Sequence, residues 1–170
     1  MKIELKKISF NERMSEETNC FVADLYINGK KVGYVKNEGC GGCTDYHGYT
    51  KEDNLIIREA EAYCKTLPRV RVEEYDFDYQ PTLESMIDEE FEKYLKEKEG
   101  KKMQKLFTTA IVIGVPNGNS YRYTKFKVPL SKLSETQLTF YVAKIVSECK
   151  DKEVLLNTNL KFENGKVTFV

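Results

Sequence analysis

The sequence lacks an excess of charge of either sign, and it lacks a long apolar run. Lysine plus arginine and aspartate plus glutamate each number 27 among 170 residues. This balance argues against a general binder of polyanions, so we expect general nucleic-acid binding to be absent. No apolar stretch approaches the ~20 residues that span a bilayer. The start of the chain, residues 1–7, alternates like a strand and lacks the apolar core of a signal peptide. We therefore expect a cytoplasmic protein that makes no contact with a membrane.

Histidine is almost missing, because His47 is the only one in the chain. The glycine-rich stretch around it matches neither GxGxxG nor GxxxxGKS, the two common phosphate-binding patterns. A single histidine leaves little equipment for acid–base or nucleophilic catalysis. These absences favour a protein that is not an enzyme, although catalysis by carboxylates such as Asp45 or Asp53 stays open.

Length and composition predict a single α+β domain that covers residues 1–170. Hydrophobic residues make up 41% and charged residues 32%, which is typical of a folded globular chain of this size. We expect a largely antiparallel sheet with about three packed helices, at residues 51–66, 83–99 and from Ser134 to about 149. Thr50 with Asp53 resembles a capping box at the start of the first helix, and Ser134 with Gln137 forms one at the start of the third. Strands are expected at residues 2–10, 20–27, 30–36, 69–75, 107–115, 121–128, 154–162 and 166–170.

Two features of this pattern bear on organisation. Segments 20–66 and 107–149 share a strand–turn–strand–helix order, but few residues are identical, so a degenerate duplication stays open. The helix expected at 83–99 has one apolar stripe that predicts its buried face. We interpret its glutamate-rich opposite side as a solvated face.

The clearest local signal is a β-hairpin. Two strand-like runs, 20–27 and 30–36, are joined by Asn28-Gly29, the pair that supplies the positive φ angles of a type I′ turn. A regular ladder from this turn places Leu25 opposite Val32. It also places Cys20 opposite Asn37, close to the glycine-rich stretch that follows.

That stretch, residues 37–48 (NEGCGGCTDYHG), collects four glycines, two cysteines and the histidine. One interpretation is a zinc site. Cys40, Cys43 and His47 lie within eight residues, and the hairpin register brings Cys20 near as a fourth ligand, the number that a closed zinc site needs. The cysteines of a reducing compartment are expected to be thiols or metal ligands rather than disulfides.

Two other interpretations of residues 37–48 stay open. A strand, a glycine-rich turn and a helix in succession can direct backbone N–H groups at a phosphate. Alternatively, the glycines only permit positive φ in a structural turn. If the stretch is functional, we expect its ligand- or partner-binding surface to comprise Lys36, Gly39, Gly41, Gly42, Asp45, Tyr46, His47 and Lys51.

A second patch mixes basic and aromatic residues, as surfaces that bind nucleic acids do. It lies on the strand expected at residues 121–128, where Tyr121, Tyr123, Lys125 and Lys127 share one face. The balanced charge of the chain favours the plainer interpretation, an ordinary amphipathic strand whose lysines face solvent.

Residues 21–47, FVADLYINGKKVGYVKNEGCGGCTDYH, resemble a segment of uncharacterised small proteins of bacteriophages and mobile elements. That resemblance implies a phage accessory protein, a non-enzymatic binding module that inhibits a host defence protein or sequesters a nucleotide signal in the host cytoplasm. Its partner would be a host protein or a nucleotide-like small molecule, and a homo-oligomer stays open. The alternatives are a small enzyme that acts on a nucleotide or phosphate ester through residues 37–48, and a structural or virion-associated protein.

Overall fold

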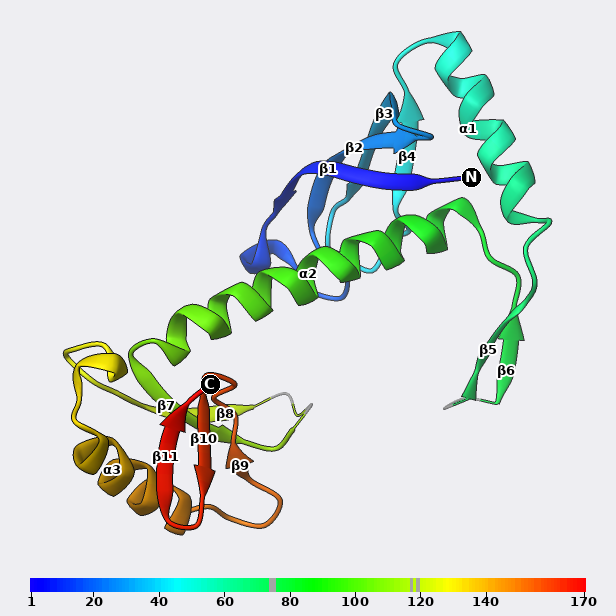
Figure 1. Cartoon of the computed structure of the whole chain (residues 1–170). Coiled ribbons are helices and arrows are strands. Elements are labelled where there is room, and N and C mark those ends of the chain that lie inside the picture. The colour runs from blue at the N-terminus through cyan, green and yellow to red at the C-terminus, as the bar shows by residue number, and fades with distance from the viewer. Residues whose placement is uncertain (74–75, 117, 119) are drawn as a thin grey trace. The chain divides into compact units, whose positions relative to one another are not determined.

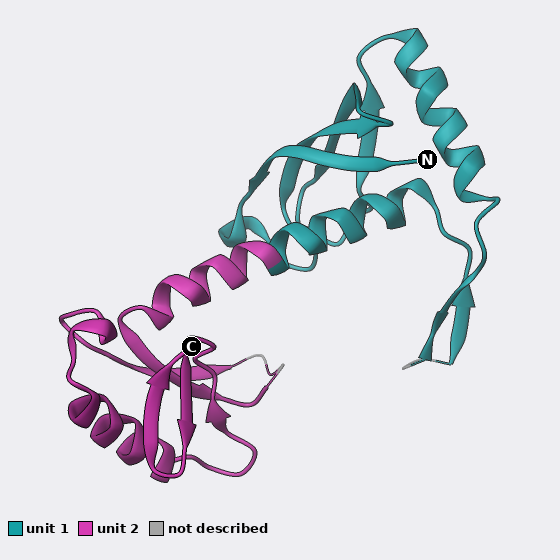
Figure 2. Cartoon of the chain, viewed as in Figure 1, with its two compact units in different colours: residues 1–96 teal, residues 97–170 magenta. Residues whose placement is uncertain are grey.

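The structure is a computed structural model that describes residues 1–73, 76–116, 118 and 120–170. Every strand pairing in this described part is antiparallel, and three α-helices accompany the strands, which confirms the predicted α+β class. The chain groups into two compact units, residues 1–96 and 97–170 (Figure 2). A single domain over the whole chain and a duplication of 20–66 and 107–149 stay predictions. No helix within the described ranges is long and apolar enough to cross a membrane.

The first unit contains a four-stranded sheet with helices on one face (Figure 1). Its order is β1-β2-β3-β4, with β1 at Ile3–Phe10, β2 at Phe21–Ile27, β3 at Lys30–Asn37 and β4 at Asp45–Gly48. Inward side chains of the sheet meet α1 (Lys51–Cys64) and the first turns of α2 (Leu83–Phe107). The fully buried side chains of this core include Phe21, Leu25, Ile27, Leu83, Ile87 and Phe91. A short 3-10 helix, η1 (Glu12–Met14), lies between β1 and β2.

The Asn28-Gly29 hairpin is confirmed, but its predicted register is wrong. Both turn residues have positive φ, 50° and 82°, and the pairs next to the turn are regular. A β-bulge then shifts the ladder by one residue between Tyr26 and Leu25. Leu25 therefore lies opposite Gly33 instead of Val32, and Asn37 lies opposite Phe21 instead of Cys20.

Burial explains the bulge. A regular ladder would place Tyr34 on the same buried face as Leu25. The shift instead places Val35 inward, where it is fully buried, and leaves Tyr34 37% exposed on the outer face. Gly33 lets β4 approach closely, because a Cβ at this position would lie 2.0 Å from the carbonyl oxygen of His47.

Helix α2 extends to Phe107, beyond its predicted end at residue 99. Its later turns are rich in lysine and glutamate, which are good helix formers and which pair at i,i+4 spacing. Two such ion pairs, Lys96–Glu92 and Lys101–Glu97, lie at 3.8 Å. The strand expected to start at residue 107 begins only at Ala110 for this reason.

The strand expected at residues 69–75 is shorter in the structure. It forms β5, Val70–Val72, which pairs with β6, Phe77–Tyr79, in a separate two-stranded sheet. Residues 74 and 75 of that prediction lie outside the described residues.

The second unit is built on β7 (Ala110–Gly114), whose residues are all buried, as its apolar run predicts. It pairs with β8 (Tyr121–Lys125) and β9 (Val154–Leu155). Helix α3 (Glu135–Ser147) starts at the predicted Ser134–Gln137 capping box. A short 3-10 helix, η3 (Leu130–Lys132), precedes it, and the hairpin of β10 (Leu160–Glu163) and β11 (Lys166–Phe169) completes the core.

Candidate functional site

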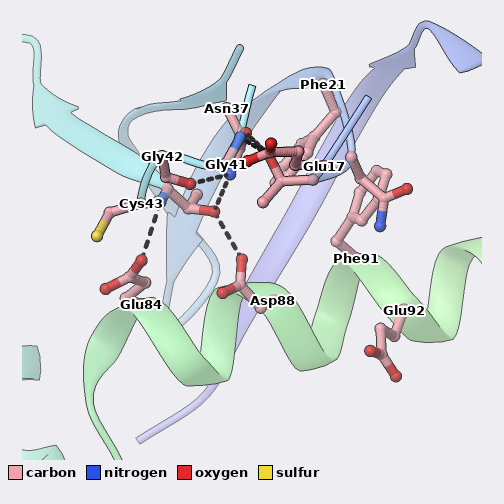
Figure 3. Close-up of a pocket in the computed structure, with 13 residues that line it drawn as sticks. Glu17, Phe21, Asn37, Gly41, Gly42, Cys43, Glu84, Asp88, Phe91 and Glu92 are labelled. Carbon is pink, nitrogen blue, oxygen red and sulfur yellow. Dashed lines mark hydrogen bonds between the residues drawn. The ribbon is translucent and has the colours of Figure 1, made fainter. Parts of the chain in front are cut away.

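The first unit contains a cavity of about 450 Å³ beside the glycine-rich stretch (Figure 3). One wall is the segment that connects β3 to β4, and the facing wall is the first part of α2. A third side comes from the residues just before β2. The described lining comprises Glu17, Thr18, Asn19, Phe21, Asn37, Gly41, Gly42, Cys43, Thr44, Glu84, Asp88, Phe91 and Glu92.

Asn37, the last residue of β3, organises the loop wall. Its Oδ1 accepts hydrogen bonds from Thr18 Oγ1 at 2.8 Å and from the Gly39 amide at 2.9 Å. Its Nδ2 donates to the Gly42 carbonyl at 3.1 Å and to Thr44 Oγ1 at 3.2 Å. Asn37 is 7% exposed, and its bonds to the Gly39 amide and to Thr44 Oγ1 are buried. One asparagine thus fixes the loop from residue 39 to residue 44.

Gly39 supplies the tightest backbone contact of the loop. Its φ is +87°, and a Cβ here would lie 2.2 Å from the Met14 carbonyl oxygen. The Gly39 carbonyl also accepts hydrogen bonds from the amides of residues 16, 17 and 18, at 2.9, 3.0 and 3.3 Å. Only glycine fits this position, so Gly39 holds the segment before β2 against the loop.

Two carboxylates of α2 hold the other end of the loop. Glu84 accepts a hydrogen bond from the Thr44 amide at 2.9 Å, and Asp88 accepts one from Thr44 Oγ1 at 2.7 Å (Figure 3). Thr44 is only 4% exposed. Residues 84, 88 and 92 are spaced by four, so Glu92 continues the same helix face along the cavity. Glu17 lines the cavity from another side, so four acidic residues contribute to the lining, and the side chain of one of them, Glu92, is 66% exposed and pairs with Lys96.

This arrangement makes the cavity electronegative. Burial raises the pKa of the Asp88 carboxyl above its usual value of 3.8, against the lowering effect of the Thr44 hydrogen bond. The Glu84 carboxylate, above all, raises the pKa of the Cys43 thiol, with smaller contributions from Asp45 and Asp88. Cys43 is therefore held in its neutral form, the reverse of an activated nucleophile.

The structure divides the predicted site residues among several places. Gly41 and Gly42 line the cavity, and Gly39 lies beneath the loop. Tyr46 points to the core side, where its hydroxyl donates to Glu61 at 2.8 Å and burial raises its pKa. The remaining four are exposed: Lys36, Asp45 and His47 on the outer face of the sheet, and Lys51 at the start of α1.

The predicted zinc ligands are not brought together. The part of the chain that the structure describes contains no group of three or more His, Cys, Asp or Glu side chains placed to hold a metal ion. Cys40 and Cys43 are exposed, and His47 pairs with Tyr34 on β3. The bulge in β3 also removes Cys20 from its expected place opposite Asn37.

The α2 wall of the cavity was not predicted, because the glutamate-rich side of this helix was interpreted as a solvated face. The i,i+4 spacing of Glu84, Asp88 and Glu92 was visible and shows that they share a face. Their pairing with Thr44, which is 40 residues from Glu84, depends on tertiary packing.

No protein-family model, curated protein or solved structure matches the chain. The chemistry of the cavity therefore has to be inferred from its own residues. Its lining offers hydrogen-bond acceptors and negative charge, and it borders the core at Phe21 and Phe91, which are each 2% exposed. Such a lining suits a ligand with a positively charged group.

Proposed function

We propose that this chain is a non-enzymatic binding module that receives a lysine or arginine side chain of a partner protein in the acidic cavity. The observation that carries the proposal is the acidic lining of one 450 Å³ space, to which Glu17, Glu84, Asp88 and Glu92 contribute. A stoichiometric binder that blocks a host protein, the role implied by the resemblance to phage accessory proteins, would use such a site.

The size and lining of the cavity support a long cationic side chain. Pockets for small ligands start at about 300 Å³, so the space suffices for a guanidinium and its stem. The carboxylates would pair with the charged head, bidentately for arginine.

The same residues argue against a nucleotide. Three backbone amides that could otherwise bind a phosphate already donate hydrogen bonds within the protein. The Gly39 amide donates to Asn37 Oδ1, the Gly41 amide to Thr18 Oγ1 and the Thr44 amide to Glu84. The carboxylates of the acidic residues that line the cavity would repel a phosphate bound in it. A nucleotide sponge or a phosphate-ester hydrolase at this loop has less support than a receptor for a cation.

Catalysis also has little support at this cavity. None of the described lining residues is His, Lys or Arg, and the pKa of the one thiol of the described lining, Cys43, is raised. The lining as described therefore offers carboxylates as its acid–base groups, without a histidine or lysine to assist them.

The proposal is tested by amide chemical-shift titration with the tripeptide acetyl-Gly-Arg-Gly-amide. We expect saturable shifts of the Gly42 and Thr44 amides, and no such shifts when citrulline, the neutral isostere, replaces arginine. The double variant Glu84→Gln, Asp88→Asn should lose the response, whereas Glu59→Gln, a change on the exposed side of α1, should keep it. Stronger loop shifts with ATP than with the arginine peptide would overturn the proposal, as would an unchanged response of the double variant.

A further inference from the structure

The two compact units of the chain carry opposite formal charges. Residues 1–96 contain 14 Lys and Arg against 20 Asp and Glu, whereas residues 97–170 contain 13 against 7. The net charges of the two units are therefore −6 and +6, and the zero total conceals both. Charges more than about 8 Å apart are largely screened at physiological salt, so a surface attracts ligands by its local composition. The second unit (magenta in Figure 2) is thus the basic part of a neutral chain.

The second unit contains a long run of residues without an acidic side chain. Residues 100–134 include seven Lys and Arg and no Asp or Glu. Three of the seven form ion pairs with carboxylates outside the run, at 3.8, 3.6 and 2.9 Å: Lys101 with Glu97, Lys102 with Glu99 and Arg122 with Glu153. The other four are exposed and take part in none of the ion pairs among the described residues: Lys105, Lys125, Lys127 and Lys132. Four positive charges of the run therefore remain after its ion pairs are counted.

Backbone contacts bring these four lysines to one part of the second unit. The Lys105 carbonyl, near the end of α2, accepts a hydrogen bond from Thr108 Oγ1 at 2.7 Å. The Thr108 carbonyl accepts one from the Leu130 amide at 2.8 Å. Leu130 is the first residue of η3, which also contains Lys132, and Lys127 lies in the short segment between β8 and η3. The end of α2, the end of β8 and η3 therefore meet, and the four lysines lie around this junction.

Two tyrosines of β8 extend the basic surface. Among the described strands β8 pairs with β7 alone, so it is an edge strand, and all five of its residues are exposed. Tyr121, Tyr123 and Lys125 alternate with the other residues of β8 and share one face. The centroids of the two tyrosine rings are 6.4 Å apart, and Tyr123 is 54% exposed. We call the two rings and the four lysines the tyrosine–lysine surface.

We infer that the tyrosine–lysine surface binds single-stranded nucleic acid. Bases would stack on Tyr121 and Tyr123, and phosphates would pair with the lysines. A duplex keeps its bases stacked on one another, whereas a single strand can present their faces to the rings. The site is independent of the acidic cavity, whose lining belongs to the first unit.

Two other roles explain less of this surface. Lysine on an edge strand discourages pairing with another strand, a role that Lys125 can fill alone. That role does not require a run of 35 residues without an acidic side chain. An acidic protein segment would pair with the lysines as well as phosphates do, but its carboxylates offer no planar base to stack on the two rings.

The test is fluorescence anisotropy with a fluorescein-labelled, mixed-sequence DNA 12-mer, offered as a single strand and as a duplex at two salt concentrations. We expect saturable binding of the single strand that weakens with salt, and much weaker binding of the duplex. Tyr121→Ala and Tyr123→Ala should each raise Kd about 5-fold or more, the usual effect of removing a stacking ring. Lys125→Gln and Lys127→Gln should each lower the magnitude of the slope of log K against log salt by about 0.7.

The matched controls lie in the first unit. Tyr49→Ala removes a tyrosine that is 52% exposed and should leave Kd unchanged. Lys51→Gln removes an exposed lysine of α1 and should leave the salt slope unchanged. Ultraviolet crosslinking of the unmodified protein to the same 12-mer needs no variant, and the adducts should map to Tyr121 or Tyr123.

Four outcomes would overturn the inference. They are no saturable binding at low salt, equal affinity for the duplex, adducts confined to the first unit, and unchanged Kd for both β8 tyrosine variants. Competition with a 12-residue polyglutamate peptide separates nucleic acid from an acidic protein. Displacement of the single strand by an equal concentration of that peptide would also contradict the inference, because it would assign the surface to an acidic protein segment.

Discussion

Replacing Gly39 by alanine should unfold the loop wall of the cavity. A residue with a side chain at φ +87° costs about 1–2 kcal/mol. The new Cβ would also lie 2.2 Å from the Met14 carbonyl oxygen and 2.8 Å from Cys20 Cβ, so the backbone must move. That movement weakens three hydrogen bonds to the Gly39 carbonyl, each worth about 0.5–1.5 kcal/mol. We expect a total loss of ~3–5 kcal/mol in the free energy of unfolding.

Gly42→Ala is the matched control for this prediction. Gly42 lies in the same loop, but a Cβ there would meet nothing within 4 Å. Its φ is also outside the positive region. We expect a change below about 1 kcal/mol in urea unfolding followed by far-ultraviolet circular dichroism. Two results would contradict this prediction: both variants unfold at the urea midpoint of the unmodified protein, or Gly42→Ala lowers that midpoint more than Gly39→Ala does.

Two further predictions concern the carboxylates of α2. Because burial raises the folded pKa of Asp88 above 3.8, the folded state binds the extra proton between the two values, and stability falls as pH rises through that window. Asp88→Asn should therefore have a higher Tm than the unmodified protein at pH 7, and the two proteins should have the same Tm at about pH 3. Differential scanning fluorimetry measures both values, and an equal Tm at pH 7 would contradict the prediction. Glu84→Gln should speed alkylation of Cys43 by iodoacetamide at pH 8, because the Glu84 charge is the main cause of the raised thiol pKa. Peptide mass spectrometry measures this rate, and an unchanged rate would show that Glu84 does not raise the thiol pKa.

Local signals in the sequence were sufficient to predict the turns and helix starts, which depend on residues close to one another along the chain. The Asn28-Gly29 turn, the Thr50 cap of α1 and the Ser134 capping box are all present as predicted. Each needs only residues within a few positions of one another, so its chemistry can be recognised directly.

The predictions that were wrong or incomplete concern features that depend on contacts between segments far apart in the sequence. The register after Tyr26 is decided by which of Tyr34 and Val35 is buried, and the alternation of that strand allows either. Residues 37–48 were recognised as a candidate site, but tertiary packing does not bring Cys20, Cys40, Cys43 and His47 together, as the zinc interpretation required. The acidic partners of Thr44 come from a helix whose position the local pattern does not specify.

The bulge at Val32 has a consequence for how the length of β3 can change. Removing Val32 would leave Leu25 opposite Gly33 and every later pair as it is, at the loss of one buried side chain. Removing a single residue after the bulge would exchange the two faces of the rest of the strand, sending lysine or tyrosine inward. Removing two adjacent residues would restore the faces. Relatives of this chain that differ in the length of β3 should therefore differ by one residue at position 32 and by pairs of residues beyond it.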